Sequence, residues 1–280
     1  MRENPGTNPF SLSGRCILIT GGTQGVGGAI AIACAQAGAN LVLQGFRDDA
    51  HAKQTVARCR EFGARVDTLF LDLIPNPATE SASTIARDLF EKSIVIEPGI
   101  DTLVNNVGTY MDGDFLELTD EIFYKTFQLN VASGLFLTKC FARHWIQHQV
   151  LGRILFTGSI NGLLAEPQHV AYDASKGAVA AMVRSLCTEL APQGIRVNSM
   201  APGLVVTPLT GILDSDQNLR DWMELHTPNR QVPKASVCGP VAVFLLSDAA
   251  EHIHGQTLYV DGGMSAWQQP GPPTSPPSKQ

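Results

Sequence analysis

The chain has 280 residues, of which 44% are hydrophobic, and this is enough to bury a large core. Its formal net charge is −6 at pH 7, and no run of Lys and Arg occurs in it. Because nucleic-acid binding requires clustered positive charge, we expect no nucleic-acid partner. No uncharged apolar stretch is long enough to span a bilayer, so we expect no membrane segment. The first residues lack the pattern of a signal peptide, so we expect a cytoplasmic protein.

The six cysteines occur singly. None lies in a CxxC pair, and none lies at metal-ligand spacing from a histidine. We therefore expect reduced thiols and no metal site.

Short β-branched runs alternate with longer Ala-rich segments, which predicts parallel strands joined by crossover helices. The expected strands are 15–20, 40–44, 65–70, 101–106, 153–158, 196–201 and 257–262. The expected helices are 25–37, 49–62, 77–92, 119–145, 171–191, 215–225 and 235–246. The strands are almost continuously apolar, so both faces of the sheet should be covered. The predicted fold is an α/β domain of the Rossmann type, with a doubly wound sheet of about seven parallel strands and helices on both faces.

No linker or internal repeat divides the chain. We expect one domain over 13–267, a flexible N-terminus over 1–12 and a disordered Pro/Ser-rich tail over 268–280.

A glycine-rich turn joins the first predicted strand to the first predicted helix, with the spacing T-G-x-x-x-G-x-G from Thr20 to Gly27. Such a turn lets backbone N–H groups approach a pyrophosphate at a helix N-terminus. The Lys-Ser/Thr pair of a P-loop is absent. The glycines could instead serve only close helix–strand packing. The candidate phosphate-binding residues are Gly21, Thr23, Gln24, Gly25, Val26 and Gly27.

The end of the second predicted strand reads "LQGFRDD". An acidic residue selecting NAD would be expected where Gly45 stands, and Arg47 follows two residues later. The cofactor prediction is thus NADP or NAD, with a slight preference for NADP, and with Phe46 and Arg47 beside the adenosine ribose. Asp49 could simply cap the next helix. Asp72 and Leu73, after the third strand, are candidates for binding the adenine.

Tyr172 and Lys176 are four residues apart in a predicted helix, so they share one helix face. A nearby ammonium group stabilises a phenolate, so Lys176 is expected to lower the pKa of Tyr172 into the range useful for general acid/base catalysis. A Y-x-x-x-K pair by itself is weak, because chance supplies it readily. Ser159 strengthens the case, because it ends the fifth predicted strand at the sheet edge where ligands bind.

Two amide-rich features point to the same edge. The fourth predicted strand ends in "NNVG", and we expect Asn105, Asn106, Val107 and Gly108 near the nicotinamide half of a cofactor. Asn130 interrupts an otherwise apolar helix, and a buried amide must find partners. It could hold a water or a helix-breaking carbonyl near Lys176, or merely stabilise a kink.

Taken in order, these motifs resemble the short-chain dehydrogenase/reductase family over about residues 13–265, with "NSMAPG" and "GQTLYVDGG" completing the pattern. The resemblance implies that Tyr172 is the general acid/base, that Lys176 binds the nicotinamide ribose, and that Ser159 orients the substrate oxygen. It also implies that Asn130 anchors a water, and that the nicotinamide end contacts Pro202, Gly203, Val205 and Thr207. Val107 stands where the family usually has Ala.

The implied activity is NAD(P)-dependent interconversion of a secondary alcohol and a ketone, on a 3-oxoacyl or small hydroxy substrate. The resemblance extends to 3-oxoacyl-carrier-protein reductases, sugar dehydrogenases and 3-hydroxybutyrate dehydrogenases. A sugar or polyol dehydrogenase, and a non-catalytic cofactor-sensing protein on the same fold, stay open as alternatives. A sugar-nucleotide epimerase is disfavoured by the glycine spacing and by the lack of a larger C-terminal domain.

Two expectations concern surfaces. The resemblance implies a homotetramer, or a homodimer, formed through the helix of Tyr172 and the long helix before it. The irregular segment 204–234 is expected to be a mobile lid. Four polar residues between Ser159 and Tyr172 could contact a polyol or could be ordinary loop residues: Asn161, Glu166, Gln168 and His169.

Overall fold

The computed structural model describes residues 8–74, 81–111, 113–207 and 216–267. Seven strands in these residues form one parallel sheet in the order β3-β2-β1-β4-β5-β6-β7. Their bounds are β1 Cys16–Ile19, β2 Asn40–Gly45, β3 Val66–Phe70, β4 Thr102–Asn105, β5 Arg153–Thr157, β6 Arg196–Pro202 and β7 Thr257–Val260. The strand order reverses between β1 and β4, which is where a doubly wound sheet binds its ligand. The predicted Rossmann-type fold is confirmed.

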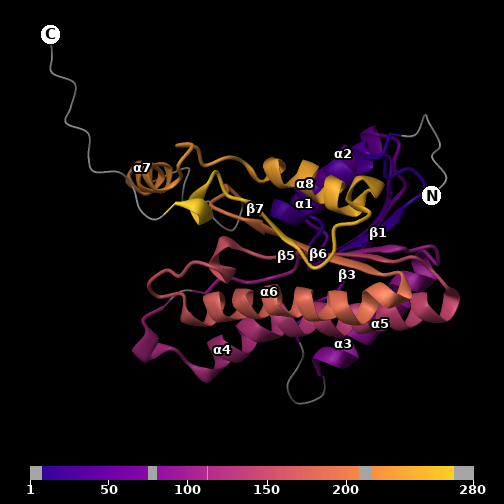
Figure 1. Cartoon of the computed structure of the whole chain (residues 1–280), viewed down its shortest axis with the longest axis horizontal. Coiled ribbons are helices and arrows are strands. Elements are labelled where there is room, and N and C mark those ends of the chain that lie inside the picture. The colour runs from indigo at the N-terminus through magenta and orange to yellow at the C-terminus, as the bar shows by residue number, and fades with distance from the viewer. Residues whose placement is uncertain (1–7, 75–80, 112, 208–215, 268–280) are drawn as a thin grey trace, which may run out of the picture.

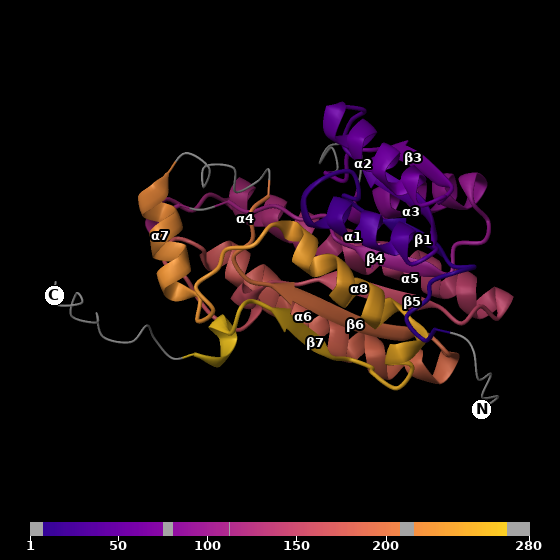
Figure 2. The same ribbon diagram turned by 90° about the horizontal axis from the view of Figure 1, so that it is seen from above.

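Helices cover both faces of the sheet (Figure 1). One layer consists of α1 (Gly25–Gln36), α2 (Ala50–Glu61) and α8 (Cys238–Leu246). The other contains α3 (Ala82–Ile96), α4 (Asp120–Phe127), α5 (Ser133–His148) and α6 (Val170–Leu190). The helix α7 (Gln217–His226) lies at one end of the molecule in both views (Figure 2). It belongs to the segment predicted as a lid, of which residues 208–215 lie outside the described residues.

Each face of the sheet has its own hydrophobic core. Leu18 and Leu103 face α3 and α5, whereas Ile17 and Ile19 face α1 and α8. Adjacent strand residues thus point to opposite, fully covered faces, and this explains why the strands are almost continuously apolar in sequence.

The helix expected over 119–145 is divided in the structure. It consists of α4, a π-helical turn over Gln128–Ala132 that contains Asn130, and α5. Apolar periodicity runs through all three pieces, so the sequence pattern does not mark the extra residue of the π-turn. Such turns are frequent at functional sites.

Part of the N-terminal segment contacts the domain: Leu12 is fully buried, and Phe10, although exposed, packs against Phe244. One predicted helix boundary differs from the structure. The helix predicted from 77 begins at Ala82, after Ser81 caps it by accepting a hydrogen bond from the Thr84 N–H. Residues 77–80 and the predicted tail 268–280 lie outside the described residues. Within the part that is described, no helix has the length and apolarity to cross a bilayer.

Candidate active site

The glycine-rich turn leads from β1 into the N-terminus of α1. Gly21 and Gly25 have φ values of 60° and 57°, which favour glycine. A Cβ at Gly27 would overlap the Gly21 carbonyl oxygen, so this position has no room for a side chain. Gln24 is the N-cap residue, but its side chain caps no backbone N–H. Within the described part of the chain, the first N–H groups of α1 thus receive no side-chain cap, as a phosphate-binding turn requires.

The other candidates in this turn have mainly structural contacts. The carbonyl oxygen of Thr23 accepts a hydrogen bond from Thr55 Oγ1 at 2.8 Å. Val26 packs against the core beneath α1. Both residues therefore fix the turn to its neighbours.

Thr20 and Asn106 fasten the turn to the end of β4. The Oγ1 of Thr20 accepts hydrogen bonds from the N–H groups of Asn106 and Val107. The amide of Asn106 donates to the carbonyl oxygens of Thr20 and Gly21. The ends of the two strands at the switch point are thereby held as one unit.

Gln44 is a site residue that the sequence analysis missed. Its buried side chain accepts a hydrogen bond from the Gly21 N–H at 2.8 Å and donates one to the Leu71 carbonyl oxygen at 2.8 Å. It thus joins the glycine-rich turn to the ends of β2 and β3. A polar residue inside an otherwise apolar strand was the available signal.

The chain that follows β2 carries an exposed cation, Arg47. Its guanidinium carbon lies 5.8 Å from the ring centre of Phe46, and its Nε lies 3.5 Å from Asp49 Oδ2. Asp49 caps α2 by accepting a hydrogen bond from the Ala52 N–H. A Cβ at Gly45 would lie 2.6 Å from Thr23 Cγ2, so an acidic side chain has no space there.

Tyr172, Lys176 and Ser159 come together at the carboxyl ends of the central strands. Tyr172 and Lys176 lie on one face of α6, with the Lys176 Nζ 5.6 Å from the ring centre of Tyr172. Lys176 donates a hydrogen bond to the Thr157 carbonyl oxygen at 3.1 Å. Ser159, two residues later, lies next to Tyr172 and acts to lower the pKa of its hydroxyl group. Three predicted residues thus form one constellation.

Burial is the main cause of the pKa shifts of Tyr172 and Lys176. It raises the pKa of Tyr172; Ser159 acts in the opposite direction, and the charge of Asp173 adds to the increase. Burial also lowers the pKa of Lys176 to about 8. The protein groups alone therefore do not lower the pKa of Tyr172, in contrast to the expectation from sequence, because two buried groups each disfavour their charged form.

Asn130 holds the loop that follows β4. Its Oδ1 accepts a hydrogen bond from the Thr109 N–H at 2.7 Å, and its Nδ2 donates to the Thr109 carbonyl oxygen and to Ser175 Oγ. A Cβ at Gly108 would lie 3.0 Å from Asn130 Oδ1 and 3.7 Å from Lys176 Nζ. The side chain therefore positions Gly108 beside the lysine.

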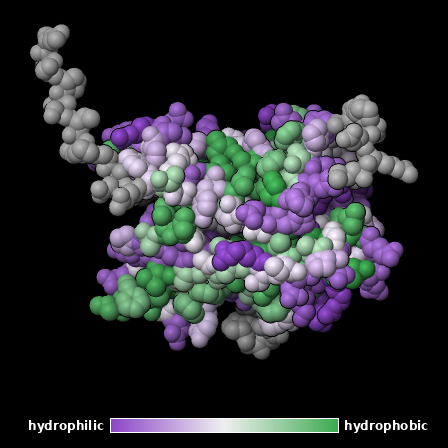
Figure 3. Space-filling model, in the orientation of Figure 1, coloured by the Kyte–Doolittle hydropathy of each residue, from purple (hydrophilic) through white to green (hydrophobic). Residues whose placement is uncertain are grey.

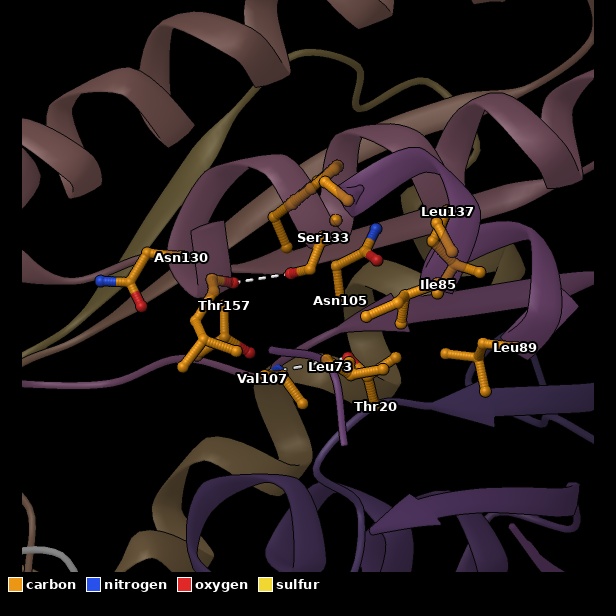
Figure 4. Close-up of a pocket in the computed structure, with 15 residues that line it drawn as sticks. Thr20, Leu73, Ile85, Leu89, Asn105, Val107, Asn130, Ser133, Leu137 and Thr157 are labelled. Atoms are coloured by element: carbon orange, nitrogen blue, oxygen red, sulfur yellow. Dashed lines mark hydrogen bonds between the residues drawn. The ribbon is translucent and has the colours of Figure 1, made fainter. Parts of the chain in front are cut away.

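A pocket lies between the sheet and helices α3 and α5, next to this constellation (Figure 4). Leu73, Asn105, Val107 and Asn130 all line it, although the Asn130 amide points away from its interior in Figure 4. Asn105 Nδ2 donates to Thr138 Oγ1 of α5, so this amide faces the helix layer.

The remaining candidates lie on neighbouring loops. Asp72 accepts a hydrogen bond from the Ile74 N–H in its own turn. Pro202 ends β6, and the N–H of Gly203 donates to the Val260 carbonyl oxygen. Val205 is buried, and Thr207 is partly exposed. Among the described residues, no group of three His, Cys, Asp or Glu side chains is arranged to hold a metal ion.

Comparison with known proteins identifies the family. A family model described as enoyl-(acyl carrier protein) reductase matches residues 21–265. The L-rhamnose 1-dehydrogenase (NAD(P)(+)) of Sphingomonas sp. is 31% identical over 90% of this chain and 97% of its own length. The cyclopentanol dehydrogenase of Comamonas testosteroni is 33% identical over 90% and 97%. The chain belongs to the short-chain dehydrogenase/reductase family.

A solved structure agrees with this membership of the short-chain dehydrogenase/reductase family. The gluconate 5-dehydrogenase from Burkholderia cenocepacia, in complex with NADP and tartrate, has 29% identity and a TM-score of 0.84, covering 93% of this chain and 98% of that one. The expectation of an NAD(P)-dependent oxidoreductase acting on an alcohol carbon is confirmed, because the relatives are dehydrogenases of this type. The relatives include an enzyme named for a sugar and an enzyme named for a cyclic alcohol. They therefore do not favour the sugar dehydrogenase alternative over the more general prediction of an alcohol oxidoreductase.

Tyr110 is a second residue near the site that the sequence alone did not reveal. Its hydroxyl group lies 2.5 Å from His169 Nε2, and its ring contacts the ring of Tyr172. The residues Asn161, Glu166 and His169, which were candidates from sequence, lie around the same loop, where Asn161 Nδ2 donates to Asp173 Oδ1. Tyr110 gave no signal in sequence, because its partners are about 60 residues away along the chain.

Proposed function

We propose that the protein interconverts a secondary alcohol and a ketone with NADP(H), and that Tyr172 exchanges the proton at the substrate oxygen. The observation that carries this proposal is the meeting of Tyr172, Lys176 and Ser159 at the sheet edge next to the glycine turn. General acid/base catalysis requires such a group within reach of the reacting oxygen.

The residues of the turn fit a nicotinamide dinucleotide. Gly27 lacks room for a Cβ, and the start of α1 carries N–H groups without a side-chain cap, so a pyrophosphate can approach the backbone. The bound nicotinamide supplies or accepts the hydride. Arg47 would pair with a 2′-phosphate, and the crowded position of Gly45 excludes an acid that would select the free hydroxyl. We therefore place NADP before NAD.

Each member of the constellation has a separate task. Ser159 would hold the substrate oxygen and Tyr172 would give it a proton or take one. Lys176, tied to the Thr157 carbonyl, would bind the nicotinamide ribose and, when charged, stabilise the phenolate. Asn130 would keep Gly108 in place, and its π-turn offers a position for an ordered water.

The substrate would be a small hydroxy or 3-oxo compound. Polar side chains around the site, such as Asn161 and His169, favour a compound with more than one oxygen. A cofactor sensor without activity is disfavoured, because the acid/base set is complete.

We further propose that the protein is a homo-oligomer and that it is located in the cytoplasm. An apolar surface covers the end of the molecule near α4 (Figure 3), where Phe115, Leu116, Phe123 and Tyr124 are exposed. Exposed apolar side chains of this kind mark contact surfaces. We place a second copy on α4 and the outer face of α6, within a homotetramer or homodimer. All six cysteines are free, which suits the reducing cytoplasm.

The test is the variant Tyr172→Phe. We expect turnover of a small secondary alcohol to fall about 10²–10⁴-fold, because the ring stays and only the proton-carrying group is lost. NADP binding, measured by fluorescence, should stay within about twofold. Turnover close to that of the wild type would contradict the role of Tyr172.

A further inference from the structure

The hydroxyl group of Ser159 forms two hydrogen bonds with one neighbouring residue, Asn161. Its oxygen accepts from the Asn161 N–H at 3.1 Å, and its proton is donated to Asn161 Oδ1 at 3.3 Å. A serine hydroxyl group has one proton and two lone pairs. The proton and one lone pair are therefore engaged within this turn, and one lone pair is left for other partners.

Asp173 determines which way the Asn161 amide faces. Asn161 Nδ2 donates to Asp173 Oδ1 at 2.8 Å, and the Glu166 N–H donates to Asp173 Oδ2 at 3.1 Å. An ionised carboxylate only accepts hydrogen bonds, so it must face the NH₂ group of the amide. The amide oxygen then faces Ser159. Because this oxygen cannot donate, the hydroxyl proton of Ser159 has to point toward it.

The packing of the turn holds this arrangement in place. Asn161 is buried, and it belongs to the 3₁₀ turn Ile160–Gly162 between β5 and α6. Asp173 lies in the first turn of α6, next to Tyr172. A Cβ at Gly162 would lie 2.9 Å from the Lys176 carbonyl oxygen, so the turn packs directly against α6. The Asn161 amide therefore has little freedom to turn over.

Tyr172 carries the second oxygen that can take the Ser159 proton. Ser159 acts to lower the pKa of Tyr172, which a hydroxyl group does by donating to the phenolate. The bond to Asn161 Oδ1 is long, at 3.3 Å, and both of its partners are neutral. A bond to a phenolate would be charge-assisted and stronger. The proton thus stays with Asn161 while Tyr172 is neutral, and it is available to an oxygen that becomes negative.

We infer that Asn161, held by Asp173, is a positioning residue that directs the single hydroxyl proton of Ser159. This proton points to the Asn161 amide oxygen in the resting protein and turns to the oxygen at Tyr172 when negative charge develops there. No covalent bond forms or breaks, because the proton stays on Ser159. The inference rests on the proposed function and adds the orientation of Ser159 to it. Because Asn161 competes with Tyr172 for this proton, its removal should make Tyr172 easier to ionise.

The test measures the ionisation of Tyr172 directly. The NADP-loaded protein, labelled with carbon-13 at the tyrosine Cζ atoms, is titrated by NMR; it has four tyrosines, and Tyr172→Phe identifies the signal. We expect Asn161→Leu to lower the pKa of Tyr172 by about 1, as for one charge-assisted hydrogen bond gained. The titratable groups around Tyr172 are unchanged in this variant: Lys176, Asp173, Glu166, His169 and Tyr110.

The same substitution in the Ser159→Ala protein separates proton direction from support of the loop. Without the hydroxyl group, Asn161→Leu should leave the pKa of Tyr172 within about 0.3. Asn40→Leu is the matched control and should change nothing, because Asn40 accepts from the Arg65 N–H at the opposite end of the sheet.

Asp173→Asn is a second variant, which keeps Asn161 but lets its amide turn over. It also removes a negative charge near Tyr172, so the pKa of Tyr172 should fall with and without Ser159. The fall should be larger when Ser159 is present, because only then does the direction of the amide matter.

An unchanged or higher pKa of Tyr172 in Asn161→Leu overturns the inference, as does a fall of the same size in the absence of Ser159. Oxidation of cyclopentanol is followed in the same proteins. Its kcat should reach half of its maximum at a pH lower by about 1 in Asn161→Leu. The expected NMR result in a protein that oxidises no alcohol would contradict the proposed function alone.

Discussion

Lys176 donates a hydrogen bond from Nζ to the Thr157 carbonyl oxygen at 3.1 Å, in a buried position. The ammonium group is thereby tied to the end of β5, two residues before Ser159. Burial leaves this ammonium group poorly solvated, and this lowers the pKa of Lys176 from 10.5 to about 8.

The first prediction concerns the stability cost of this lysine. Between about pH 8 and pH 10.5 the unfolded chain binds more protons at Lys176 than the folded chain does, so this group makes the unfolding free energy rise with pH. Lys176→Met removes the effect. At about pH 7 the variant should be more stable than the wild type by on the order of 2 kcal/mol, and the difference should shrink toward about pH 10. Urea unfolding at both pH values measures it.

Lys139→Met is the control, because Lys139 is exposed on α5 and should show a difference that does not change with pH. A constant difference for Lys176→Met would mean that the lysine is well solvated in the folded protein.

The second prediction concerns Asn130. Asn130→Ala leaves the Thr109 N–H and carbonyl groups and the Ser175 hydroxyl without their amide partner. We expect a loss of about 2–4 kcal/mol in unfolding free energy and a fall in turnover, because Gly108 loses its support. Ser175→Ala removes only one of these bonds and should cost about 1 kcal/mol. Equal losses in denaturant unfolding would contradict the bridging role of Asn130.

The sequence predicted the strands to within about two residues and the helix face that joins Tyr172 to Lys176, because apolar runs and i,i+4 spacing are local signals. It did not reveal the π-turn at Asn130, since the apolar pattern continues through it. Gln44 and Tyr110 went unrecognised as site residues for another reason. Their partners come from other strands or loops, and only the folded sheet edge brings them together.

The third prediction concerns Gln44. Gln44→Leu fits the strand but leaves the Gly21 N–H and the Leu71 carbonyl group unpaired. We expect a loss of about 2–4 kcal/mol in unfolding free energy. We also expect weaker NADP binding by about tenfold or more, because the phosphate turn loses an anchor. Gln54→Leu, on the exposed side of α2, should affect neither quantity. If both variants bind NADP equally well, the turn does not depend on Gln44.

The fourth prediction concerns the choice of cofactor. Arg47 is exposed after the end of β2, and its Nε lies 3.5 Å from Oδ2 of Asp49, whose Oδ1 caps α2. If its guanidinium pairs with a 2′-phosphate, Arg47→Ala should lower kcat/KM with NADPH by about tenfold and leave the value with NADH within about twofold. Arg58→Ala is the control: Arg58 is an exposed arginine of α2 that, like Arg47, has a carboxylate partner, here Glu61, and its loss should leave the NADPH to NADH ratio unchanged. An equal loss with both cofactors would show that Arg47 supports the fold of the turn and does not read the ribose. Thr23 already fills the space next to Gly45, so an acidic side chain at this position cannot simply convert a preference for NADPH into one for NADH. Gly45→Asp should instead weaken the binding of both cofactors.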